Sequence, residues 1–327
     1  MPTYQPVVLP HWPSGGATAG QVRAEIDHWV RSDAMTALVQ SFGGTPPTGT
    51  TDEALAQLVA FSDTWDYRRS GLERGEIEAI DYADDIDELV CRAALALGLS
   101  ARQDPHGAFD HVLVLGGGPR TALARSHHAA ELLRGPVTTA RVSALSSLRP
   151  MSEAEITFAR SQGMSDASVE ADAMASGMFR AFGMDSHPSR RSGTTPVGTS
   201  WWTLAFTTAG LTVAVLAAPS SAPGRRANTV DTLTGWAALV STPRRDDRVL
   251  VVTTDLFVPF QHADAIRVLG LRFGCGIDTV GLDTLRYDRW LRPNTHTGIL
   301  QEVRSAILSM DRLAIACTEK LAANGEP

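Results

Sequence analysis

Short apolar runs that alternate with helix-patterned segments constrain the fold of this chain more than any other feature. Three runs are rich in valine and leucine: His111–Leu115 (HVLVL), Leu211–Ala217 (LTVAVLA) and Arg248–Thr253 (RVLVVT). Runs of this length predict strands that are buried on both faces, as in a parallel sheet covered by helices. The chain therefore predicts an α/β protein rather than an all-helical or all-β one.

Weaker patterns complete the prediction for the second part of the chain. Further strands are expected at Thr138–Leu145 and Ile277–Gly281. Helices are expected at Thr121–Leu133, Val169–Phe182, Asn228–Val240, Phe260–Leu269 and Thr297–Leu313. Residues 183–210 look like an insertion. The alternation predicts a Rossmann-like three-layer α/β/α core with a parallel sheet and right-handed crossovers.

The N-terminal part of the chain has a different character. Residues 1–105 carry 16 acidic and 7 basic side chains, whereas residues 106–327 carry 20 acidic and 22 basic ones. Apolar residues at three- and four-residue steps predict helices over Gln21–Arg31, Asp52–Phe61 and Glu76–Leu97. We expect an acidic helical subdomain (1–105) and a Rossmann-like domain (106–327), joined by a linker at Ser100–Asp110.

The helix predicted at Glu76–Leu97 is densely acidic, which raises the hypothesis of a metal site. Charges at helical spacing usually face water, and the chain has no HExxH motif. The cysteines, Cys91, Cys275 and Cys317, lie far apart without a CxxC pair. We therefore expect no metal ion.

Composition also restricts partners and location. A net charge of −7 argues against a protein that coats nucleic acid. The N-terminus, MPTYQPVVLPHW, lacks the basic segment followed by an apolar segment that is typical of a signal peptide. Isolated cysteines are typical of a reducing cytoplasm. Trp201–Pro219 carries no charge, but its threonines and glycine favour a strand over a membrane span. We expect a cytoplasmic protein without a nucleic-acid or membrane partner, and the oligomeric state stays open.

Ligands of parallel α/β sheets bind at the carboxyl ends of the strands, so the residues that follow each strand are the candidates. A turn of three glycines, Gly116 to Gly118, separates the first strand from its helix. Glycines let a ligand approach the backbone, and a helix N-terminus offers N–H groups to an anion. The turn is neither a dinucleotide fingerprint nor a P-loop. The candidate ligand-binding residues are Gly116, Gly117, Arg120, Ser143, Arg225, Asn228, Thr229, Thr253 and Thr254.

The order of these motifs resembles that of the SanA/ElyC/YdcF family. That pattern has a glycine turn, a strand ending near serine, a Glu-Ala, an Asn-Thr with an acidic residue, and a strand ending in Val-Thr. The corresponding elements here are Val112–Gly117, Val142-Ser143, Glu170-Ala171, Asn228-Thr229 with Asp231, and Val252-Thr253. The resemblance covers about residues 106–310. It implies a Rossmann-like fold and, through the YdcF branch, similarity to S-adenosylmethionine-binding proteins.

We expect the protein to bind a small nucleotide-like or anionic metabolite, of the S-adenosylmethionine or sugar and nucleotide phosphate class. Gly117 and Arg120 would hold its anionic group, and Glu170 would accept hydrogen bonds or serve as a base. These three residues should converge with Asn228 on one pocket, because βα connections emerge at one edge of the sheet. Thr229 and Asp231 would complete its polar wall.

Two other functions stay open at this point. One is a hydrolase that uses His262 with Asp231 or Asp255, since His262 follows the fourth strand. The other is a non-catalytic protein that docks through the acidic helical subdomain. The cofactor, and whether group transfer follows binding, are also left open.

Overall fold

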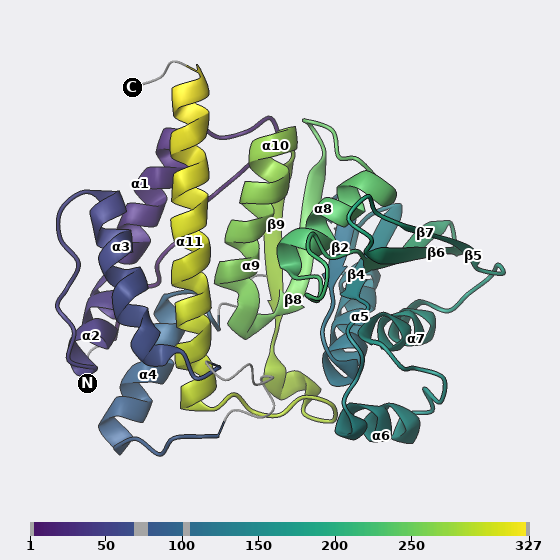
Figure 1. Cartoon of the computed structure of the whole chain (residues 1–327), viewed down its shortest axis with the longest axis horizontal. Helices are drawn as coiled ribbons and strands as arrows, with labels where there is room; N and C mark the ends of the chain where they lie inside the picture. Colours follow the sequence, from purple (N-terminus) through teal and green to yellow (C-terminus); the bar gives the residue numbers. More distant parts are fainter. Residues whose placement is uncertain (1–2, 69–77, 101–104, 325–327) are drawn as a thin grey trace.

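A seven-stranded, mostly parallel sheet forms the centre of the protein (Figure 1). The computed structural model describes residues 3–68, 78–100 and 105–324. The strand order is β5-β6-β7-β4-β2-β8-β9. The bounds are β2 His111–Leu115, β4 Arg141–Ser147, β5 Ser189–Thr194, β6 Ser200–Thr208, β7 Leu211–Ala218, β8 Arg248–Thr254 and β9 Gly276–Leu282. A separate pair, β1 (Gly107–Ala108) and β3 (Val137–Thr138), is also parallel.

The five parallel strands give the fold its class. Across the sheet they follow one another as β7, β4, β2, β8 and β9. Numbered along the chain, that order is the third, second, first, fourth and fifth strand, which is the doubly wound Rossmann order. The predicted Rossmann-like α/β core is therefore confirmed.

Helices cover both faces of this sheet. On one face lie α5 (Pro119–Arg134) and α7 (Glu170–Phe182), with α6 (Glu153–Ser161) beside α5. On the other face lie α8 (Thr229–Leu239) and α9 (Val258–Ala265), and a π-turn and the short α10 (Leu271–Phe273) follow α9.

The central strand β2 contains an unbroken apolar run because both of its faces are buried. Val112 and Val114 pack into the core beneath α5 and α7, whereas Leu113 and Leu115 pack into the core on the opposite face. Successive side chains of a strand point to opposite faces, so a strand covered on both sides has no solvent face.

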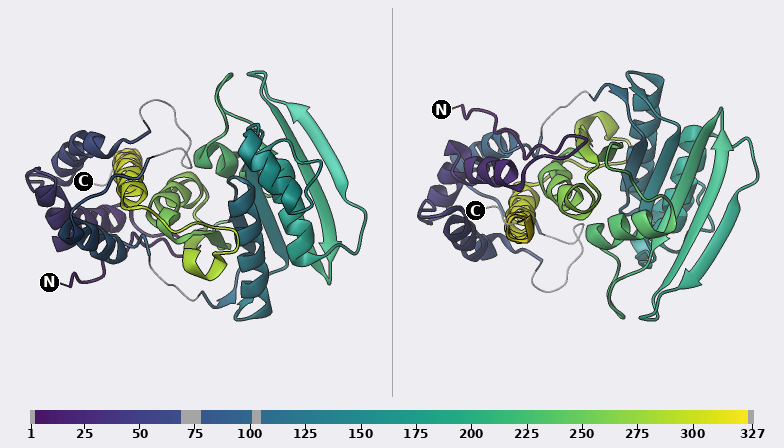
Figure 2. Two further views of the ribbon diagram at one scale, coloured as in Figure 1. Left: turned by 90° about the horizontal axis from the view of Figure 1, so that it is seen from below. Right: turned by 90° about the horizontal axis from the view of Figure 1, so that it is seen from above.

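A helical layer closes one end of the molecule. Its helices are α1 (Ala19–Val30), α2 (Asp33–Ser41), α3 (Thr51–Ser62) and α4 (Asp84–Ala96), grouped around the C-terminal helix α11 (His296–Asn324). Figures 1 and 2 show α11 between these helices and α9, while β5 lies at the opposite end. In residues 3–68 and 78–100 no strand joins the main sheet. Both ends of the chain build this layer. One cluster of buried apolar residues includes side chains from the layer and from the sheet, on both sides of the expected boundary at residue 105.

The predicted insertion at residues 183–210 extends the sheet instead. It supplies β5 and β6; β6 runs antiparallel to β7, and β5 runs antiparallel to β6. Trp202 and Phe206 of β6 are buried on the core side, so the segment Trp201–Pro219 is a strand, a turn and a second strand. None of the described helices is long and apolar enough to cross a membrane.

Two other element predictions need correction. The helix predicted at Glu76–Leu97 begins at Asp84, and residues 76–77 lie outside the described part of the chain. The N–H of Ile80 donates to Thr297 Oγ1 at 2.9 Å instead of entering a helical turn. Of the predicted linker, residues 101–104 lie outside the description, and Gly107–Ala108 forms β1. The apolar spacing of residues 76–97 gives no sign of the contact between Ile80 and Thr297, which lies 217 positions later in the chain.

Candidate functional site

The strand order creates a topological switch point between β2 and β8. From β2 the chain crosses one face of the sheet through α5, and from β8 it crosses the other face through α9. The two connections therefore separate at the carboxyl ends of β2 and β8, and ligands of open α/β sheets bind at such a switch point. Gly116–Gly118 follow β2 here, and Asp255 follows β8.

Close packing explains the first glycine of the turn. A Cβ atom on Gly116 would lie 2.5 Å from the carbonyl oxygen of Leu145 and 2.9 Å from Ser146 Oγ. Only glycine fits there, because the end of β4 approaches the backbone so closely.

The turn leads into a helix whose start lacks a side-chain cap. Gly118 is the N-cap of α5, and no side chain hydrogen-bonds to the first turn. By contrast, Ser152 caps α6 and Asn228 caps α8. The first backbone N–H groups of a helix have no partner within the helix, so an anion can bind to them.

Replacing Gly116 by alanine should destabilise the protein by about 1–3 kcal/mol, because the methyl group overlaps the end of β4. Urea unfolding followed by tryptophan fluorescence measures the change. The matched control is Gly20→Ala in α1, where an added Cβ meets nothing within 4 Å. That control should be neutral or stabilise by up to about 1 kcal/mol. Equal stability of the two variants would contradict the close approach at Gly116.

A buried arginine joins the two strand ends and was missed in the sequence. Arg125 of α5 is 1% exposed. Its guanidinium donates to the carbonyl oxygens of Leu115 and Gly116 at 2.9 and 2.7 Å, and to Thr254 Oγ1 at 3.0 Å. The sequence signal for this contact is an arginine within the apolar stripe of a predicted helix. Burying an arginine is costly unless its donors have partners, so an arginine at such a position indicates a set of acceptors.

Glu170 belongs to a second polar cluster at the end of β4. Its carboxylate accepts from Ser147 Oγ at 2.6 Å and pairs with Arg149 at 2.9 Å. Arg149 also pairs with Glu155 at 2.7 Å. Burial acts to lower the pKa of Arg149, but hydrogen bonds and charges from both glutamates raise it above its usual range. Glu170 thus lies at the predicted edge with a cationic partner already beside it.

The predicted residues near α8 form a third cluster. Asp231 is buried and accepts from Arg225 at 2.8 Å and from the backbone N–H of Asn228 at 3.0 Å. Asn228 Oδ1 in turn accepts from the N–H of Asp231 at 3.0 Å. These three residues therefore build the start of α8 and its preceding loop.

The predicted threonines at this edge lie beside the switch point. Gln261 of α9, a residue the sequence did not single out, hydrogen-bonds to Thr253 and reaches Thr229 Oγ1 at 3.4 Å. Thr253 is the penultimate residue of β8, and Thr254 is its last. One amide thus links the end of β8 to the start of α8.

Two predicted residues lie away from the other candidates. Ser143 lies in the middle of β4, because the strand continues to Ser147, so the serines at its carboxyl end are Ser146 and Ser147. Arg120 donates to the carbonyl oxygen of Trp290 at 3.0 Å, and its guanidinium lies 3.9 Å from the ring centre of Phe158. It therefore packs towards α6 instead of joining Glu170.

His262 has a structural role. Its Nδ1 lies 2.9 Å from Thr279 Oγ1, and its Nε2 lies 2.7 Å from the carbonyl oxygen of Pro10. Burial lowers the pKa of the imidazole. Both ring nitrogens are used to hold the N-terminal segment against β9, where Trp12 also bridges Ile277. These contacts favour a packing role for His262 over that of a catalytic base, so they give the hydrolase hypothesis no support.

The candidate site contains no recognisable metal centre. Across the part of the chain that the structure describes, no three His, Cys, Asp or Glu side chains are grouped so that they could hold a metal ion. The carboxyl that directly follows β8 is that of Asp255, which accepts from Thr284 Oγ1 at 3.0 Å. Burial raises the pKa of this carboxyl.

The strand order and the covering helices define a doubly wound α/β protein with a helical layer at one end. A family model described as the Rv3785 N-terminal domain matches residues 13–98, which include α1 to α4. The chain is 34% identical over 340 residues to the uncharacterized proteins Rv3785 and MT3893 of Mycobacterium tuberculosis and Mb3814 of Mycobacterium bovis. These alignments cover 94% of this chain and 93% of each relative, so the chain belongs to the Rv3785 family. No solved structure gave a significant match.

Proposed function

We propose that this protein binds a small anionic or nucleotide-like metabolite at the switch point between β2 and β8. The observation that carries the proposal is the N-terminus of α5, which follows Gly116–Gly118 and has no side-chain cap. Backbone N–H groups and the positive end of the helix dipole favour a phosphate or carboxylate at such a position.

Arg149 supplies the side-chain donor for the same anion. Its Nη2 lies 3.8 Å from the position that a Cβ atom on Gly118 would take. Of its two carboxylate partners, the Glu155 side chain is 26% exposed and the Glu170 side chain 11%. Glu155 Oε1 lies 2.5 Å from that same position, so an anion at the turn would replace Glu155 on Arg149, while Glu170 keeps its pairing.

Carboxylates near the switch point favour a ligand that also carries hydroxyl or amino groups. Glu170 and Asp255 accept hydrogen bonds at the ends of β4 and β8. Nucleotides, sugar phosphates and S-adenosylmethionine combine such donors with an anionic group, and the resemblance to the SanA/ElyC/YdcF family supports the last of them. Group transfer would take Asp255 or Glu170 as its acid–base group.

The same proposal includes a cytoplasmic location. All three cysteines, Cys91, Cys275 and Cys317, are free thiols. Free thiols in this number, with two of them buried, agree with a reducing compartment.

A thermal-shift screen of the full chain tests the proposal with inorganic phosphate, ATP, glucose 6-phosphate and S-adenosylmethionine. A ligand at about 100 times its dissociation constant stabilises the folded state by about 2.7 kcal/mol. The Arg149→Lys variant keeps the charge that Glu155 and Glu170 require but loses the planar fork, so it should lose most of the ligand-induced shift.

The matched control is Arg191→Lys on the edge strand β5, which should keep the shift of the wild-type protein. Two outcomes would contradict the proposal. Either none of the four compounds stabilises the wild-type chain, or the Arg149→Lys variant shows the full shift.

A further inference from the structure

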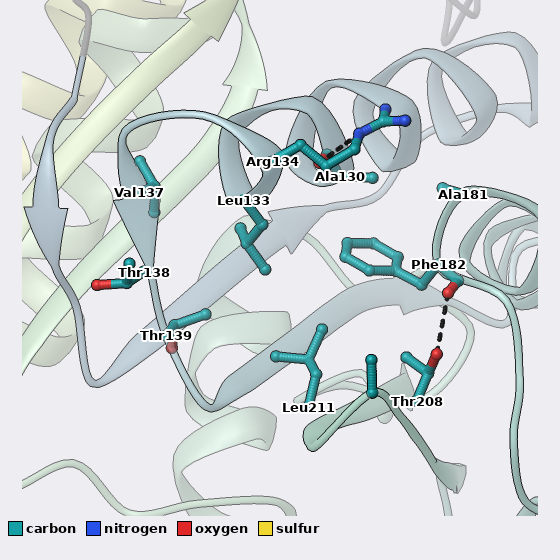
Figure 3. Close-up of a pocket in the computed structure, with 11 residues that line it drawn as sticks. Ala130, Leu133, Arg134, Val137, Thr138, Thr139, Ala181, Phe182, Thr208 and Leu211 are labelled. Carbon is teal, nitrogen blue, oxygen red and sulfur yellow. Dashed lines mark hydrogen bonds between the residues drawn. The ribbon is translucent and has the colours of Figure 1, made fainter.

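A pocket of about 360 Å³ lies at the amino edge of the sheet, opposite the switch point (Figure 3). It lies between the C-terminal ends of α5 and α7, the strand β3 and the turn that joins β6 to β7. Its lining residues are Ala130, Leu133, Arg134, Val137, Thr138, Thr139, Ala181, Phe182, Thr208, Ala209 and Leu211. A volume of this size is within the usual range for small-molecule sites.

The inner wall of this pocket is apolar. Figure 3 shows Leu133, Phe182 and Leu211 pointing towards one another from α5, α7 and β7. These three side chains are only partly buried against the core beneath α5 and α7. An apolar ligand body would cover them and gain the free energy of removing that surface from water.

The charge at the mouth is positive. Arg134 is the charged residue of the lining, and its Nε donates to the carbonyl oxygen of Ala130 at 3.2 Å. This bond orients the guanidinium while leaving its terminal nitrogens at an exposed position. Burial and the charge of Arg289 lower the pKa of His127, Glu131 acts to raise it, and Arg134 and Arg180 act to lower it further. Three arginines therefore lie near this end of α5 beside a single carboxylate.

Hydrogen bonds hold the far wall in place. Thr208 Oγ1 donates to the carbonyl oxygen of Phe182 at 3.1 Å, and the N–H of Ala209 donates to Asp185 Oδ2 at 2.7 Å. Ala209 has a positive φ of +46°. Among the described residues it is the one non-glycine residue with a positive φ. Such a conformation costs about 1–2 kcal/mol and persists where the surroundings enforce it. The wall is thus formed before any ligand arrives.

We propose that this pocket binds a small amphipathic carboxylate, with its aromatic or aliphatic body on the apolar wall and its carboxylate on Arg134. The planar fork of arginine matches a carboxylate with two parallel hydrogen bonds. The charge of Arg134 has to outweigh the negative ends of the α5 and α7 helix dipoles, so the carboxylate would sit directly on the guanidinium at the exposed mouth.

Nuclear magnetic resonance titration of the full chain tests this site, with benzoate as the probe and benzamide as its uncharged counterpart. Benzoate should give saturable amide shifts at Val137, Thr138, Ala181 and Ala209. The Arg134→Gln variant should bind benzoate about tenfold more weakly, which is the scale of a charge-assisted hydrogen bond, and should bind benzamide as the wild type does.

Two further variants separate the site from a general charge effect. Arg180→Gln removes a neighbouring arginine that does not line the pocket, and it should leave benzoate binding within about twofold of wild type. Ala181→Phe fills the pocket and should abolish binding of both probes. Shifts that do not saturate, shifts that map elsewhere, or wild-type benzoate affinity in Arg134→Gln would each overturn the proposal.

Discussion

The Arg125→Met variant is expected to lose about 3–5 kcal/mol of folding free energy, the largest effect of any single substitution considered for this protein. Arg125 donates to Leu115, Gly116 and Thr254 in an environment that excludes water. Methionine has a similar length but no donors, so two carbonyl oxygens at the strand ends lose a partner. Removing one side of a buried charged network costs about this much, because the remaining polar groups stay buried.

Urea unfolding curves measure this loss, and a second arginine provides the control. Arg191→Met, on the exposed edge strand β5, should change stability by less than about 0.5 kcal/mol. Arg125→Lys should lie between the wild type and Arg125→Met, since lysine keeps the charge but not the fork. If Arg125→Met were as stable as Arg191→Met, Arg125 would not join the two strand ends as the structure shows.

Acid should destabilise the protein through His128, with an effect of about 3 kcal/mol. Burial lowers the pKa of His128 to about 4 in the folded protein, against an ordinary value of 6.5. Glu131 acts to raise this pKa and Arg286 to lower it further. The unfolded chain therefore binds a proton that the folded chain does not, between those two pKa values. Stability is complete above about pH 6.5 and falls as the pH drops towards 4, by about 1.4 kcal/mol per pH unit.

A comparison of two histidine variants isolates this contribution. His128→Asn removes the titrating group, so its unfolding free energy should fall by about 3 kcal/mol less than that of the wild type between about pH 7 and pH 4. His28→Asn, at an exposed position of α1, should follow the wild-type pH profile. His111 and His262, whose pKa values burial also lowers, should leave a residual slope of the same sign in His128→Asn. Parallel profiles for His128→Asn and the wild type would contradict the burial of a neutral imidazole.

The central fold was predictable because local sequence and tertiary burial agree there. Four consecutive apolar residues in β2, Val112 to Leu115, contribute to the cores on both faces of the sheet, which only a strand covered on both sides accommodates. The edge strand β5 was missed because Ser189–Thr194 are almost entirely exposed and are held by backbone bonds to β6. A strand without a buried face leaves no alternation in the sequence to detect.

The candidate site was predictable in its location but not in its contacts. Topology placed the glycine turn at the carboxyl end of β2, and the structure confirms that position. The partners of Arg125 and His262 include Thr254 and Pro10, which lie 129 and 252 positions away in the chain. A histidine that follows a strand and a histidine that anchors the N-terminal segment look alike in sequence, since the difference lies in these distant partners.

The measurement that tests the central claim most directly is a crystal structure of the full chain with the compound that gives the largest thermal shift. The account predicts its anionic group within about 3 Å of the backbone N–H groups at the start of α5, between the ends of β2 and β8. It also predicts that Arg149 turns from Glu155 towards that group. An anionic group bound elsewhere, with the N-terminus of α5 left to water, would contradict the account.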